Sequence, residues 1–91
     1  MAIVFSESAG KHGFTQSDAI HAITHAVFRK MSFDMSRTSG GPAPDLYVGP
    51  ARSGLTIEVM AYTRPPRTLV IFHVMELRPK YRALMDQEGW L

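Results

Sequence analysis

The feature that most constrains this chain is residues 55–78, LTIEVMAYTRPPRTLVIFHVMELR, in which two strand-like runs flank a pair of prolines. The first run alternates with a period of two, with residues 55, 57, 59 and 61 on one side, which predicts a strand with one buried face. The second run is apolar on both sides, with residues 70, 72 and 74 opposite residues 69, 71, 73 and 75, which is typical of an interior strand. Pro65 and Pro66 remove two backbone donors between the runs, so we predict a hairpin.

The hairpin and the residues that follow it are basic. Between positions 64 and 82 the only acid is Glu76, and the cations are Arg64, Arg67, Arg78, Lys80 and Arg82. This clustering is typical of a phosphate-binding face, and the alternative is an ordinary solvated surface. Arg64 and Arg67 belong to the turn, so strand curvature and register decide whether they approach Arg78.

Length and composition place the chain in a single small domain, residues 1–91. Its 45% hydrophobic and 20% charged residues are ordinary for a globular protein. The sequence has no cysteine, which excludes disulfides and thiolate zinc sites. No apolar run approaches the roughly 20 residues of a membrane span, and no signal peptide is recognisable. We therefore expect a cytoplasmic protein.

The remaining elements follow from capping and periodicity. Residues 2–5 suit a strand, and residues 46–48 suit another before the hairpin. Thr15 and Asp18 predict the capped start of a helix whose apolar stripe runs through about residue 29, and Pro79 predicts the first turn of a closing helix through about residue 87. Residues 31–35 suit a further short segment and residues 36–44 a loop. The predicted class is α+β, an antiparallel sheet with one long helix packed on it and a C-terminal helix.

The histidines are the first candidates for chemistry. His21 and His25 are four residues apart on the predicted helix, the spacing of a two-histidine metal site, although the sequence supplies no matching third ligand and a polar helix face is the simpler interpretation. His73 lies in an apolar strand, where it is either a hydrogen-bonded core residue or a functional one near the basic cluster. Lys11 and His12 precede a helix N-terminus, where free N–H groups favour anions, so we expect a phosphate near this loop.

Three short motifs give the chain a resemblance to a known family. Lys11-His12-Gly13 before a helix, Thr63-Arg64 at the hairpin turn, and Glu76-Leu77-Arg78 after the second strand resemble the motifs of BrnT-type toxins, which are small ribonucleases of bacterial toxin–antitoxin pairs with a RelE-like fold. The resemblance spans about residues 8 to 82. Pro65-Pro66 and Glu76 differ from the family pattern, which has an acidic residue in the turn and a serine in the last motif.

The resemblance implies cleavage of messenger RNA without a metal or other cofactor, and inhibition by a cognate antitoxin protein. In that role Arg64 and Arg78 would hold the phosphate, Lys11 would neutralise it, and His12 or His73 would transfer protons. Residues expected to bind the substrate around this site are Arg67, Lys80 and Tyr81. The alternatives are a RelE-like protein that binds nucleic acid or a partner without catalysis, and a metal-binding protein that uses His21 and His25.

Overall fold

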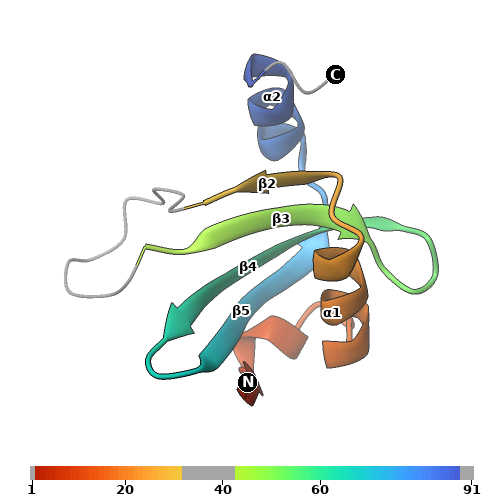
Figure 1. Ribbon diagram of the computed structural model, residues 1–91. Helices are drawn as coiled ribbons and strands as arrows, with labels where there is room; N and C mark the ends of the chain where they lie inside the picture. The colour runs from red at the N-terminus through yellow and green to blue at the C-terminus, as the bar shows by residue number, and fades with distance from the viewer. Residues whose placement is uncertain (1, 32–42, 89–91) are drawn as a thin grey trace.

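A computed structural model describes residues 2–31 and 43–88 of the chain. Two helices and a short 3-10 helix accompany a five-stranded sheet of order β1-β5-β4-β3-β2 (Figure 1). Strands β2 to β5 are antiparallel to their neighbours, whereas β1 pairs with β5 in parallel. The predicted α+β class is confirmed. The elements are β1 (Ala2–Phe5), η1 (Ser8–Gly10), α1 (Gln16–Thr24), β2 (Phe28–Lys30), β3 (Asp45–Pro50), β4 (Thr56–Arg64), β5 (Thr68–Glu76) and α2 (Pro79–Gln87).

Helix α1 begins as predicted and ends earlier than predicted. Thr15 and Asp18 form the expected capping box, because each side chain bonds to the backbone amide of the other. The prediction of a helix through about residue 29 is wrong, since α1 ends at Thr24 and Phe28–Lys30 pair with β3 as β2. Two side chains form hydrogen bonds with backbone carbonyls of the last turn. The Thr24 hydroxyl bonds to the carbonyl of Ile20, and His25 Nδ1 bonds to the carbonyl of His21. Burial of Phe28 in the sheet then favours the strand over another helical turn.

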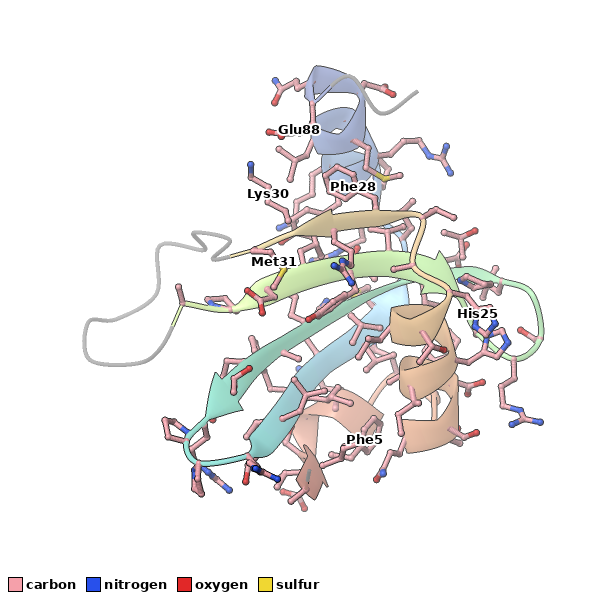
Figure 2. The ribbon with its side chains drawn as sticks, viewed as in Figure 1. Phe5, His25, Phe28, Lys30, Met31 and Glu88 are labelled. Carbon is pink, nitrogen blue, oxygen red and sulfur yellow. The ribbon has the colours of Figure 1, made fainter. Side chains whose placement is uncertain are left out.

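Each face of the sheet has its own core, and we name each face after the helix that packs on it. On the α1 face, Ala19 and Ala22 of the helix pack against Ile57, Val59 and Ile71. On the α2 face, Tyr81 and Met85 pack with residues from β2, β3 and β4, and in Figure 2 Phe28 points from β2 toward α2. Both faces of β4 are therefore covered, whereas its alternation predicted one buried face. The strand residues in the core of the α2 face are Phe28, Leu46, Val48 and Met60.

A β-bulge in β5 changes which side chains share a face. Met60 is opposite His73 and Ala61 is opposite Ile71, so Phe72 is an extra residue in β5. Ile71 and Val74 consequently belong to the core of the α1 face, and Phe72 packs with the core of the α2 face. His73 shares the α2 face with Met60, its cross-strand partner. The alternation predicted for residues 69–75 is therefore wrong beyond Phe72.

The N-terminal segment runs along the edge of β5. Strand β1 pairs with the first half of β5 and ends at Phe5, opposite Ile71. Beyond this point η1 continues beside β5, where the Ser8 hydroxyl donates to the Phe72 carbonyl at 2.8 Å. The loop that carries Lys11 and His12 follows η1 directly. The parallel pairing of β1 thus brings residues 11 and 12 next to the second half of β5.

Some predictions fall outside the described residues. The loop predicted at residues 36–44 lies outside them except for residues 43 and 44, and the short segment predicted at residues 31–35 lies outside them except for Met31. The closing helix is confirmed, with Pro79 in its first turn. Within residues 2–31 and 43–88, neither helix has the length and apolar composition needed to cross a membrane.

Candidate active site

Glu58 is the one buried charged residue of the described chain, and it organises the candidate site. Its side chain is fully inaccessible to solvent, on the α2 face of β4 two residues before Met60. The carboxylate accepts hydrogen bonds from His73 and from Arg78, so both oxygens have partners. A buried carboxylate is costly unless it is paired and hydrogen-bonded. Its contacts fix the positions of the two residues that pair with it.

His73 reaches Glu58 diagonally across the hairpin. Met75 is the direct cross-strand partner of Glu58, and His73 is the partner of Met60. The bulge places the His73 ring on the α2 face, where its Nε2 lies 2.7 Å from Glu58 Oε2. A carboxylate only accepts, so Nε2 carries the proton and Nδ1 is the acceptor of the neutral ring. The side chain of His73 is 19% exposed, which leaves part of the ring open to solvent.

Arg78 pairs with Glu58 at the end of the hairpin. Its Nη2 and Nε lie 2.7 and 3.0 Å from Glu58 Oε2, and its backbone amide lies 2.9 Å from Oε1. The guanidinium carbon is also 5.2 Å from the ring centroid of Tyr81. The side chain of Arg78 is only 34% exposed, so about two thirds of its surface is covered. Arg78 therefore has a structural role as the counter-ion of Glu58 in addition to any role at a phosphate.

The hydrogen bonds keep Glu58 ionised. Burial alone would raise the pKa of Glu58, but the bonds from His73 and from the side chain and amide of Arg78 outweigh burial and lower that pKa below its ordinary value. The same carboxylate raises the pKa of Arg78. The site thus contains a carboxylate and a guanidinium that are both charged at neutral pH.

His12 faces His73 from the neighbouring loop. The two ring centroids are 6.3 Å apart, with an angle of 71° between the planes, so the rings meet edge to face. Both His12 and Lys11 are exposed, and Gly13 has a φ of 90°, which favours glycine at the turn into α1. His73 in turn lies beside Arg78, with 3.4 Å between Arg78 Nη2 and His73 Nε2. Of the residues expected at the site, His12, His73 and Arg78 are therefore linked by successive contacts, and Lys11 precedes His12 in the same loop.

The other predicted site residues are located differently. Arg64 and Arg67 lie at the β4–β5 turn, the opposite end of the hairpin from Arg78, roughly 20–25 Å away at the rise of an extended strand. At that separation Arg64 and Arg67 do not contact the same phosphate as Arg78. Tyr81 is 6% exposed and belongs to the core of the α2 face, so it supports Arg78 and does not offer a free surface to a substrate. Lys80 is exposed, with its ammonium 5.0 Å from the Tyr81 ring centroid.

The histidine pair on α1 does not form a metal site among the described residues. His21 and His25 stack with ring centroids 4.2 Å apart, and His21 Nδ1 is engaged with the carbonyl of Pro50 at 2.9 Å. No group of three His, Cys, Asp or Glu suited to a metal occurs in residues 2–31 and 43–88. The pair instead caps α1 and joins it to the end of β3.

Glu58 was absent from the site predicted from sequence, because the alternation of apolar residues at 55, 57, 59 and 61 put Glu58 on the opposite, exposed face of the strand. A signal was nevertheless present. Positions 60 and 62 on the same side are Met and Tyr, so Glu58 is a single carboxylate on a largely apolar face. An acid in that setting requires a partner of opposite charge, and Arg78 follows the neighbouring strand.

Comparison with known proteins gives no relative for this site. A scan against protein-family models, a search of curated proteins and a search of solved structures each found no match. The function is therefore argued from the chemistry of the site.

Proposed function

We propose that this protein is a metal-independent endoribonuclease whose active site contains His12, His73 and Arg78. The observation that carries the proposal is the pair of imidazole rings, 6.3 Å apart, beside a guanidinium that Glu58 holds in place. RNA carries its own nucleophile, the 2′-hydroxyl, so cleavage requires only a base, an acid and a cation at the phosphate. The three side chains supply these three functions.

The chemistry follows from the hydrogen bonds of His73. Its Nε2–H donates to Glu58, so Nδ1 is the nitrogen that accepts the proton of the 2′-hydroxyl. The 2′-oxygen bonds to the adjacent phosphorus, and the bond from phosphorus to the 5′-oxygen breaks. His12, protonated at the outset, donates its proton to the departing 5′-oxygen. The products are a 2′,3′-cyclic phosphate and a 5′-hydroxyl, so the atoms and protons balance.

Arg78 supplies positive charge where negative charge develops. The non-bridging oxygens of the phosphate gain charge in the transition state, and a fixed cation stabilises that state more than the substrate. Glu58 fixes the guanidinium at Nε and Nη2 and leaves Nη1 for the phosphate. Glu58 also stabilises the imidazolium that His73 becomes after it accepts the proton.

The wider role in this proposal is that of a BrnT-type, RelE-like toxin in the cytoplasm that cleaves messenger RNA and is inhibited by a cognate antitoxin protein. Support comes from the Lys11-His12-Gly13 motif, which lies beside His73, and from a four-stranded antiparallel meander with the first strand parallel to the last. The net charge of +2 suits an RNA substrate.

The test is cleavage of single-stranded RNA in EDTA by the purified protein, with the 3′ ends identified by mass spectrometry. We expect 2′,3′-cyclic phosphate ends. His73→Ala should lower the rate by about 10²–10⁴-fold, the contribution of a general base. Arg29→Ala is the control, because Arg29 is an exposed cation on β2 and should retain the wild-type rate. Cleavage that requires a metal, or that is equal in His73→Ala, would contradict the proposal.

The alternative is a protein of the same fold that binds nucleic acid without cleaving it. Its supporting observation is the ion pair itself, since Glu58 compensates much of the charge of Arg78. Tight RNA binding by the wild type without any cyclic phosphate product would favour this function.

A further inference from the structure

We propose that the α2 face of the β4–β5 hairpin binds the single-stranded RNA that flanks the cleaved phosphate, with a base stacked on Tyr62, which Phe72 supports, and phosphates held by Arg64 and Arg67. We name this surface the hairpin track. It deepens the proposed function, because the track extends from the candidate site to the β4–β5 turn. It also gives a role to the two arginines that the site itself leaves out.

The strand geometry places the residues of the hairpin track on one face of the sheet. Side chains of alternate residues in β4 share a face, so Tyr62 and Arg64 lie on the same face as Glu58 and Met60. The bulge places Phe72 on this face immediately beside His73. The Tyr62 and Phe72 rings have centroids 5.8 Å apart, with an angle of 45° between the planes. From the site outward, the order is therefore His73, Phe72, Tyr62 and then the turn arginines.

Both aromatic side chains are partly exposed, in contrast to the buried residues beside them. Phe72 packs at the margin of the α2-face core, and Tyr62 packs against Phe72. The Tyr62 ring is thus supported by Phe72 on one side and partly exposed, an arrangement suited to stacking on a base. Such stacking tolerates any base, so the track implies contact with RNA but little sequence preference.

The charge of the track favours a polyanion over a protein segment. Between Glu58 and Glu76 the sequence has no acidic residue. Arg64 and Arg67 are exposed, and neither forms a salt bridge within the described chain. The turn lies at the end of the hairpin away from α2 (Figure 1). Cations at both ends of an aromatic surface match the pattern of single-strand binding sites, in which a positive groove follows the backbone.

The experiment measures binding separately from cleavage. The probe is a fluorescein-labelled RNA of eight nucleotides with every 2′-hydroxyl methylated, which removes the nucleophile, and the readout is fluorescence anisotropy at several salt concentrations. The variants are Tyr62→Ala and Arg64→Ala/Arg67→Ala. The matched control is Arg29→Ala/Arg52→Ala, which removes two exposed arginines elsewhere on the protein. Circular dichroism melts establish that each variant is folded.

We expect Tyr62→Ala to weaken binding about 10-fold or more through lost stacking. The turn double variant should weaken binding and reduce the slope of log K against log salt by about 1.4, at 0.7 per phosphate contact. Wild-type affinity and slope in both variants, or equal losses in the control, would overturn the track. Failure of the proposed function would appear differently, as absence of cleavage of unmodified RNA.

Discussion

The side chain of Glu58 accepts hydrogen bonds from the amide, Nε and Nη2 of Arg78, a residue 20 positions later in the chain. This contact ties the first half of β4 to the residue that precedes α2. It also brings the guanidinium next to His73, with 3.4 Å between Arg78 Nη2 and His73 Nε2, two nitrogens that converge on the same carboxylate oxygen. The stability of the fold and the geometry of the candidate site thus depend on one buried carboxylate.

We predict that Glu58→Gln lowers the free energy of unfolding at pH 7 by about 3 kcal/mol, because it leaves the partly buried guanidinium without its counter-ion. The measurement is urea denaturation at a series of pH values. The folded state lowers the pKa of Glu58 below its ordinary 4.5, so its stabilisation is complete above pH 4.5 and is lost as the pH falls through the lower folded value.

The difference between wild type and Glu58→Gln should therefore shrink in acid. Comparison of the two proteins cancels the acid sensitivity of Asp18, whose pKa the Thr15 amide lowers in both. Glu76→Gln is the control, because Glu76 is exposed at the end of β5 and should change stability by less than about 0.5 kcal/mol. A pH-independent difference would mean that the charge of Glu58 does not stabilise the fold.

We further predict strong coupling between Glu58 and Arg78 in a double-mutant cycle. Arg78→Gln should cost about 3–5 kcal/mol, because it leaves a buried carboxylate without its main partner. The double variant Glu58→Gln/Arg78→Gln should be more stable than the sum of the single costs implies, by at least about 1 kcal/mol. Additive costs from urea denaturation would show that the two residues act independently.

The bulge in β5 leads to a prediction about how much Ile71 and Phe72 each contribute to stability. Simple alternation makes Phe72 a core residue, and its loss would then cost about 3–5 kcal/mol. In the structure Ile71 is fully buried and Phe72 is only half-buried. We expect Ile71→Ala to cost about 3–4 kcal/mol and Phe72→Ala about 1–2 kcal/mol. The opposite order in chemical denaturation would mean that β5 runs without the bulge.

Local signals in the sequence were sufficient to predict several elements. Three such signals act within a few residues, so the neighbouring sequence is enough to predict their effects. They are the capping box at Thr15 and Asp18, the proline at the start of α2, and the proline pair between β4 and β5. The end of α1 was not predictable in this way, because Phe28 pairs with Val48, and that contact forms only in the folded sheet.

The candidate site was only partly predictable for the same reason. The Lys11-His12-Gly13 loop and His73 were identified by residue type, but their proximity depends on the parallel pairing of β1 with β5. The separation of Arg64 from Arg78 follows from their positions at opposite ends of the hairpin, which charge clustering along the sequence does not reveal. Glu58 was missed because strand alternation says which side chains share a face, and not which face is buried.

The most direct test of the account concerns the separate roles of the two histidines. The substrates are a dinucleotide of RNA and uridine 3′-(4-nitrophenyl phosphate), whose leaving group departs without a proton. His12→Ala should lower cleavage of the dinucleotide by about 10²–10⁴-fold and cleavage of the nitrophenyl ester by less than about 10-fold, whereas His73→Ala should lower both. Equal losses on the two substrates in His12→Ala, or wild-type rates in either variant, would contradict a site in which His73 is the base and His12 the acid.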